Sequence, residues 1–218
     1  WQTINGIKDT ALYLSGFYSI YSKRLENEIL EGDIPNHIAI ILDGNRRWAK
    51  RNLTIQEKGH FRGADAVENL LDWCEEFDIK IITLYVLSAE NLQRKNDELD
   101  YLYELIHKRL EKLYNDPRIH KNRMRVKAIG TIELLPESIK DVLKRLDEGT
   151  KEYNNHFLNI AIAYGGQNEL VDAVKKIGEK IKSGELDSDE INKEVIESNL
   201  YTSHLPQSSP DMILRTSG

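Results

Sequence analysis

The sequence contains one cysteine, few prolines and no long hydrophobic run. Cys74 alone cannot form an intramolecular disulfide framework or a cysteine-rich zinc site. No apolar segment approaches the roughly 20 residues of a membrane-spanning helix. Positive charge is in deficit, with 30 Lys and Arg against 36 Asp and Glu, for a net charge of −6. This balance argues against general nucleic-acid binding, which usually needs a basic face.

The composition is that of an ordinary globular protein. Of the 218 residues, 40% are hydrophobic and 30% are charged. No internal repeat, low-complexity tract or Pro/Gly-rich linker divides the chain, so its length predicts one main domain. Residues 1–33 are predicted to form an amphipathic helical extension, and residues 34–218 the main domain. The extension has apolar residues at three- and four-residue steps, at Ile7, Leu14, Phe17, Tyr18, Tyr21 and Leu25.

Buried strands and amphipathic helices alternate in the main domain. Three apolar runs predict strands at residues 37–42, 81–87 and 157–163, and shorter candidates lie at 125–129 and 212–214. Helical periodicity covers residues 66–77, 99–113, 138–153 and 169–181. This alternation predicts an α/β fold, with a mostly parallel central sheet covered by helices on both faces.

Polar, cationic and glycine residues follow four of the predicted strands. Ligands bind outside the carboxyl ends of such strands, so these positions are the candidate site. The segments are Asp43-Gly44-Asn45-Arg46-Arg47-Trp48, Ser88-Ala89-Glu90-Asn91 with Arg94, Tyr164-Gly165-Gly166, and Arg215-Thr216-Ser217-Gly218.

The segment after the first strand is suited to binding a phosphate group. Gly44 lets a ligand approach the backbone, and Arg46 and Arg47 supply forked donors for phosphate oxygens. A carboxylate at Asp43 beside these groups is explained if a divalent cation bridges it to the phosphate. The alternative is a plain turn, because Asp-Gly is a common turn dipeptide. The sequence has no P-loop, no dinucleotide fingerprint and no adjacent Asp-Asp pair.

Five segments in chain order resemble the signatures of the cis-prenyltransferases, the undecaprenyl and dehydrodolichyl diphosphate synthase family. They are residues 37–50 (HIAIILDGNRRWAK), 59–63 (GHFRG), 83–91 (TLYVLSAEN, followed by Arg94), 159–166 (NIAIAYGG) and 211–218 (DMILRTSG). The resemblance covers residues 34–218, which would then be the catalytic domain. It implies the family's fold, with an elongated hydrophobic tunnel.

The resemblance also implies a reaction and a set of roles. An isopentenyl diphosphate would condense 1′–4 with an allylic diphosphate, farnesyl or geranylgeranyl diphosphate, and each new double bond would be Z. Asp43 would bind Mg²⁺ and support departure of the allylic diphosphate. Asn91 would assist proton removal. Substrate-binding residues would be Gly44, Asn45, Arg46, Arg47, Trp48, His60, Ser88, Ala89, Glu90, Arg94 and Arg215, the two last gripping isopentenyl diphosphate.

The sequence departs from the family pattern at several points. Gln56 stands where bacterial members commonly carry Arg, and Leu87 and Leu92 replace residues that are often aromatic. The family's Arg-x-x-Ser segment and distal Glu are absent, so we expect further residues after Gly218. The N-terminal unit and residues 115–122 resemble archaeal and eukaryotic members.

Simpler interpretations compete at single positions. His60 and Asn91, taken alone, are more typical of structural and helix-capping residues. Trp48 and Trp73 are expected in the core or a pocket wall, Cys74 is expected to be buried and inert, and residues 99–113 to be core that lines the tunnel. The N-terminal helix either packs on the domain or lies at a membrane interface.

The sequence therefore predicts a Mg²⁺-dependent Z-type polyprenyl diphosphate synthase that supplies a polyprenyl lipid carrier. A homodimer in the cytoplasm, peripheral at the membrane, is expected, with no nucleic-acid partner. Two alternatives remain: a cis-type prenyltransferase with a non-isopentenyl acceptor, and a non-catalytic subunit of a hetero-oligomeric prenyltransferase. The second would normally lack the Asp-Gly-Asn signature that this sequence keeps.

Overall fold

The computed structural model describes residues 17–94 and 96–216 and divides the chain into two compact units, residues 1–35 and 36–218. In the first unit the described element is helix α2, Phe17–Leu30. The predicted helical positions Ile7 and Leu14 lie outside the described residues. No helix in the described ranges combines the length and apolar character that crossing a membrane requires.

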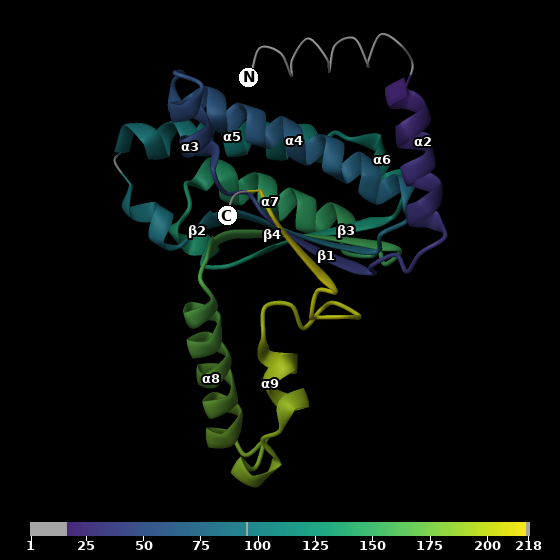
Figure 1. Ribbon diagram of the computed structural model, residues 1–218. Helices are drawn as coiled ribbons and strands as arrows, with labels where there is room; N and C mark the ends of the chain where they lie inside the picture. The colour runs from purple at the N-terminus through teal and green to yellow at the C-terminus, as the bar shows by residue number, and fades with distance from the viewer. Residues whose placement is uncertain (1–16, 95, 217–218) are drawn as a thin grey trace. The chain divides into compact units, whose positions relative to one another are not determined.

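The second unit is built on a five-stranded sheet in the order β3-β4-β2-β1-β5, and every neighbouring pair is parallel (Figure 1). The strands correspond to the five predicted apolar runs. Their bounds are β1 His37–Ile41, β2 Ile81–Ser88, β3 Met124–Ile129, β4 His156–Tyr164 and β5 Met212–Arg215.

Helices lie on both sides of this sheet. Within the unit, Figure 1 shows α4, α5 and α7 on one side and α8 and α9 on the other. The predicted α/β fold is confirmed. The helix bounds are α3 Asn45–Arg51, α4 Gln56–Glu76, α5 Asn96–Tyr114, α6 Pro117–Lys121, α7 Glu137–Thr150, α8 Gly166–Lys182 and α9 Lys193–Asn199, with 3₁₀ turns η1 Glu90–Gln93, η2 Ile132–Leu134 and η3 Ser188–Glu190.

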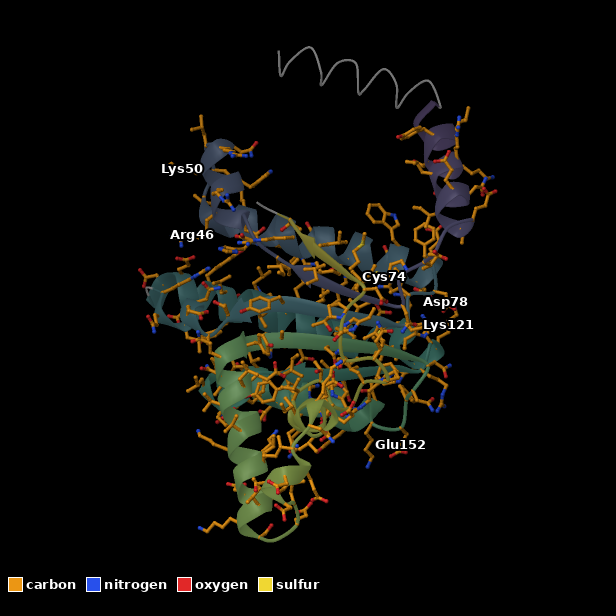
Figure 2. All side chains as sticks on the ribbon, turned by 60° about the horizontal axis from the view of Figure 1, so that its bottom comes forward. Arg46, Lys50, Cys74, Asp78, Lys121 and Glu152 are labelled. Atoms are coloured by element: carbon orange, nitrogen blue, oxygen red, sulfur yellow. The ribbon has the colours of Figure 1, made fainter. Side chains whose placement is uncertain are left out.

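The central strands β2 and β4 form the middle of the core. Six consecutive residues of β4, from Leu158 to Ala163, are buried, as expected for a strand covered on both faces. Cys74, labelled in Figure 2, is also buried, and burial raises the pKa of its thiol to about 11, as expected for an inert cysteine. Trp73 is 57% exposed and lines no cavity, so its predicted place was wrong. Neighbouring helical residues point about 100° apart, and Cys74 takes the inward position.

The segment between α9 and β5 is held to the sheet through His204. Its Nε2 lies 2.8 Å from Asn159 Oδ1 on β4, and its Nδ1 lies 3.1 Å from the Tyr201 carbonyl. Burial, followed by the nearby charge of Lys127, lowers the pKa of His204 from 6.5 to about 4. The folded protein therefore keeps this ring neutral at pH values where the unfolded chain protonates it.

We expect this difference to make stability depend on pH. Between about pH 6.5 and pH 4 the unfolded state binds one proton more at His204, so the free energy of unfolding falls as the pH falls through this window. The contribution should be about 1–2 kcal/mol, since water reaches part of the ring. Urea denaturation at pH 7 and pH 5 should show a smaller loss for His204→Gln than for wild type. His107→Gln on α5 is the control, and equal losses in both variants would contradict the assignment.

Candidate active site

Four strands of the sheet end side by side at one edge. β4, β2, β1 and β5 are neighbours in that order, and all point the same way. The polar segments that follow them are therefore brought to one edge, as the sequence predicted. This is the edge at which the candidate site lies.

The Asp43-Gly44 segment is a tight turn that positions a carboxylate. Gly44 has φ 90°, a left-handed conformation that favours glycine, and its N–H donates to Asp43 Oδ1 at 2.6 Å. The Gly44 carbonyl accepts from Trp48 N at 2.8 Å in the first turn of α3. The turn and the functional interpretation are thus compatible, because the turn itself holds the Asp43 carboxylate at the strand end.

Arg215 at the end of β5 pairs with Asp43 at the end of β1. Its Nε and Nη2 donate to Asp43 Oδ2 at 3.0 and 2.5 Å, and Arg47 Nη2 lies 3.5 Å from the same oxygen. The hydrogen bond from Arg215 is the main reason that the pKa of Asp43 lies below 3.8. Asp43 is therefore an ionised carboxylate at neutral pH, in contact with two guanidinium groups.

A second carboxylate, Glu98 at the start of α5, contacts three other predicted site residues. It accepts from Arg94 Nη1 at 2.9 Å, and it lies 3.7 Å from Arg46 Nε and 3.8 Å from His60 Nε2. Its side chain is only 19% exposed. Glu98 was not predicted as a site residue, although its four-residue step from Arg94 is the usual spacing of a helical ion pair.

Asn91 is oriented by the same arginine. Its Oδ1 accepts from Arg94 Nε at 3.0 Å and Nη2 at 2.7 Å, and its backbone N–H donates to Ser88 Oγ at 3.2 Å. Asn91 thus links Ser88 at the end of β2 to Arg94. The Asn91 carbonyl is held by a guanidinium group, which fixes the direction of its amide.

A cavity of about 520 Å³ opens at this edge between α4, α5 and the sheet. Its mouth is polar, and eight predicted site residues line it: Asp43, Gly44, Asn45, Arg46, Arg47, His60, Asn91 and Arg94. Five others do not: Trp48, Ser88, Ala89, Glu90 and Arg215. Arg215 still contacts Asp43 at the mouth. Trp48 on α3 is 39% exposed and does not line this cavity, so its predicted place in the core or a pocket wall was wrong.

The body of the cavity is apolar. Leucine and isoleucine side chains of the sheet and of α5 line it, including Leu84, Leu102, Leu105, Leu110, Leu158 and Ile160. The expectation that residues 99–113 are core lining a tunnel is confirmed. A charged mouth leading to an apolar body suits an amphiphile with an anionic head and a hydrocarbon tail.

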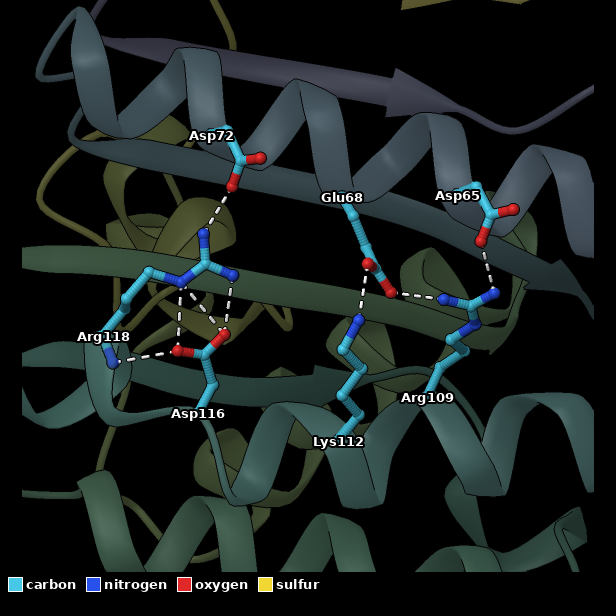
Figure 3. A network of polar contacts seen from close by, with 7 residues as sticks. All are labelled: Asp65, Glu68, Asp72, Arg109, Lys112, Asp116 and Arg118. Carbon is cyan, nitrogen blue, oxygen red and sulfur yellow. Dashed lines mark hydrogen bonds and ion pairs between the residues drawn. The ribbon is translucent and has the colours of Figure 1, made fainter.

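One flank of the cavity is closed by ion pairs between α4 and the helices α5 and α6 (Figure 3). Arg109 contacts Asp65 and Glu68, Lys112 donates to Glu68 Oε2 at 2.6 Å, and Arg118 joins Asp72 to Asp116. The hydrogen bond from Lys112 is the main cause that lowers the pKa of the Glu68 carboxyl group. The seam between these helices is therefore held by charge as well as by apolar packing.

Comparison with known proteins decides which family has this site. A family described as "Putative undecaprenyl diphosphate synthase" matches residues 41–218. The chain belongs to the cis-prenyltransferase family. It is a prenyl-group transferase, and the predicted reaction, condensation of isopentenyl diphosphate with an allylic diphosphate, is confirmed at the level of the family.

Two archaeal cis-prenyltransferases show how similar the chain is to its relatives. Both are named tritrans,polycis-undecaprenyl-diphosphate synthase (geranylgeranyl-diphosphate specific). The protein of Methanocaldococcus jannaschii is 47% identical over 204 residues, 94% of this chain and 73% of the relative. That of Methanopyrus kandleri is 41% identical over 205 residues, 94% of this chain and 75% of the relative.

Solved structures of cis-prenyltransferases give the same fold. Lavandulyl diphosphate synthase from Lavandula x intermedia, in complex with dimethylallyl diphosphate, has a TM-score of 0.77 and 29% identity, covering 83% of this chain and 77% of that one. A probable undecaprenyl diphosphate synthase from Campylobacter jejuni has a TM-score of 0.63 and 28% identity, covering 84% of this chain and 76% of that one.

Proposed function

We propose that this cis-prenyltransferase elongates geranylgeranyl diphosphate with isopentenyl diphosphate to a Z-polyprenyl diphosphate. The observation that carries the proposal is the cavity, whose arginine-rich mouth leads to an apolar body lined by α5 and the sheet. The archaeal relatives at 47% and 41% identity, whose names specify geranylgeranyl diphosphate, support this starter. Its four prenyl units match a cavity that is apolar well beyond the mouth.

The residues of the mouth can hold two diphosphates. Arg46 and Arg47, next to Asn45, face the allylic diphosphate in this assignment, and Arg94 and Arg215 face that of isopentenyl diphosphate. In the structure these arginines are paired with the carboxylates Asp43 and Glu98. Substrate phosphates compete for the same guanidinium groups, which are preorganised to stabilise the charge that develops as the allylic C–O bond breaks.

The donor set at Asp43 fits Mg²⁺. Among the described residues no group of three or more His, Cys, Asp or Glu is arranged to enclose a metal. Mg²⁺ suits such a site because it commonly binds through one or two carboxylates together with substrate phosphates. Asp43 is ionised and faces the mouth, so it is the residue that would hold the ion. When bound, the ion neutralises charge on the departing diphosphate.

Starter preference is tested by competition. Full-length protein is incubated with labelled isopentenyl diphosphate, Mg²⁺ and equal amounts of dimethylallyl, farnesyl and geranylgeranyl diphosphates, and the products are resolved by chain length. The proposal predicts that geranylgeranyl diphosphate is elongated first. Preferential use of a shorter starter would overturn the starter assignment.

A transfer to a non-isopentenyl acceptor is the second candidate. The structural similarity to lavandulyl diphosphate synthase bound to dimethylallyl diphosphate favours it. An incubation with allylic diphosphates alone separates the two activities. Condensation without isopentenyl diphosphate would support this candidate. If no condensation occurs, chain elongation remains as the proposed activity.

A homodimer is the assembly that we propose. β5 lies at the edge of the sheet with Met212 and Ile213 exposed, and α8 exposes Leu170, Val171 and Val174. Exposed apolar side chains on an edge strand and on a helix are typical of surfaces that pair with another chain. Light scattering coupled to gel filtration should give the mass of two chains, and a monomer at micromolar concentration would contradict this.

The cavity also predicts how product length changes with the volume of its deep end. Glu98 lies in the first turn of α5, against Arg46 and Arg94 of the mouth. At about 1.5 Å rise per residue, Leu113 lies about 22 Å further along the helix. Leu113 lines the cavity. We expect Leu113→Ala to lengthen the main product and Leu113→Trp to shorten it, each by one prenyl unit or more. An unchanged ladder in both variants would show that chains do not reach this end.

A further inference from the structure

The turn between α3 and α4 combines positive charge with exposed apolar side chains. We define the α3–α4 tip as Lys50, Arg51, Leu53, Ile55 and Lys58. We propose that this tip docks on a bilayer that carries anionic lipids. The choice of a bilayer rests on the proposed function, because the product of that function is a lipid.

The apolar part of the tip is displayed to solvent. Leu53 is 96% exposed and Ile55 is 60% exposed. Leu53 also has φ 49°, a left-handed conformation that is unusual for a bulky residue. This conformation closes the end of α3, where Leu53 N–H donates to the Lys50 carbonyl at 3.3 Å and Thr54 N–H to the Ala49 carbonyl at 3.0 Å, and it leaves the Leu53 side chain in solvent. Two adjacent aliphatic side chains at the end of a turn can enter the headgroup region of a bilayer.

The charge around these side chains is positive in a protein whose net charge is −6. Lys50, Arg51 and Lys58 are exposed, and none of them forms an ion pair with a carboxylate in the described part of the chain. Elsewhere most exposed cations of α4 to α6 have such partners (Figure 3). Residues 50–58 carry these three cations and one carboxylate, Glu57, for a net charge of +2. Cations in excess around an apolar tip are complementary to an anionic lipid surface, to which each contributes attraction.

The tip lies next to the mouth of the cavity. α3 begins at Asn45, which lines the mouth, and ends at Arg51 in the tip, so the helix spans about 10 Å. Figure 2 shows Arg46 of the mouth and Lys50 of the tip on this same short helix. Docking through the tip therefore brings the mouth close to the lipid headgroups. A polyprenyl diphosphate leaving the cavity then reaches the bilayer without crossing bulk water.

Binding to vesicles tests the proposal without turnover. Full-length protein is sedimented with vesicles of phosphatidylcholine alone and of equal parts of phosphatidylcholine and phosphatidylglycerol. We expect binding to the anionic vesicles that weakens with salt. The double variant Leu53→Ser/Ile55→Ser should bind about tenfold more weakly. The triple variant Lys50→Gln/Arg51→Gln/Lys58→Gln should bind on the order of a hundredfold more weakly, at about fivefold for each charge.

Matched controls lie on other elements. Leu134→Ser removes an aliphatic side chain that is also 60% exposed, and Lys121→Gln/Lys151→Gln/Lys182→Gln removes three exposed lysines that likewise have no ion pair in the described part of the chain. Both controls should bind as wild type does. Equal weakening in the tip variants and the controls would overturn the proposal, as would wild-type binding by the tip variants. A tip variant that changes the oligomeric state instead would show a contact between copies.

The same preparations separate this proposal from the proposed function. Elongation of a short, soluble allylic diphosphate in detergent solution should be unchanged in the tip variants, because no tip residue lines the cavity. If the protein elongates the starter and the tip variants bind vesicles no more weakly than the controls do, the docking surface alone is overturned. If the tip variants alone lose vesicle binding and the wild-type protein elongates no starter, the proposed function alone is overturned.

Discussion

Replacing Asp43 by Asn is expected to lower the rate of prenyl transfer on the order of a thousandfold. Asparagine has the shape of aspartate and its Oδ1 can still accept from Gly44 N–H, so the turn should persist. The negative charge disappears, and with it the pairing to Arg215 and Arg47 and the ligand proposed for Mg²⁺. The rate is measured as labelled isopentenyl diphosphate incorporated at saturating substrate.

Asp78→Asn is the matched control for this loss. Asp78 is also a carboxylate with a lowered pKa, caused mainly by its hydrogen bond from Lys80, but it precedes β2 at the opposite edge of the sheet. Its replacement should leave turnover unchanged. An Asp43→Asn protein that keeps its turnover within about threefold would remove Asp43 from the catalytic centre.

Replacing Gly63 by Ala is expected to reduce kcat/KM by about tenfold to a hundredfold while leaving the fold intact. A Cβ at this position of α4 would lie 2.5 Å from Asn45 Oδ1 and 2.8 Å from its Nδ2. The amide of Asn45 must therefore move away from its place in the mouth. Because Ala is favoured over Gly in a helix by about 1 kcal/mol, the free energy of unfolding should not fall.

Gly178→Ala is the control for the helical effect. Gly178 lies in α8, and a Cβ there would meet nothing within 4 Å. This variant should gain up to about 1 kcal/mol of stability and keep wild-type turnover. If Gly63→Ala also kept wild-type turnover, the position of the Asn45 amide would not matter for the reaction. A large loss of stability in Gly63→Ala would instead show that the helices α3 and α4 move apart.

Much of this site could be predicted from the sequence because parallel strands place their carboxyl ends together. The apolar runs gave the five strands, and the polar residues after β1, β2 and β5 then had to share one edge. Three different segments supply Asp43, Arg94 and Arg215, and the resemblance to the cis-prenyltransferases assigned these residues to one site. The structure adds the contact between Arg215 and Asp43, which no local pattern contains.

Other features depend on contacts between elements that are distant in the sequence, and they could not be predicted from local patterns. Glu98 contacts Arg46 and His60 only because the start of α5 lies against α3 and α4. Helix α4 begins at Gln56, whereas the sequence predicted a start at residue 66. Gly59 and Gly63 would usually interrupt a helix, but here the lack of a side chain lets α4 approach Asn45 closely. Periodicity alone cannot show that a glycine is selected by a neighbouring element.

The proposed function requires that this chain builds a Z-polyprenyl diphosphate from isopentenyl units. The most direct test incubates full-length protein with ¹³C-labelled isopentenyl diphosphate, geranylgeranyl diphosphate and Mg²⁺, and determines both chain length and the geometry of the new double bonds by NMR. We predict a ladder of products whose added double bonds are all Z, abolished by EDTA. Products whose added double bonds are E, or no elongation of any allylic diphosphate, would contradict this function.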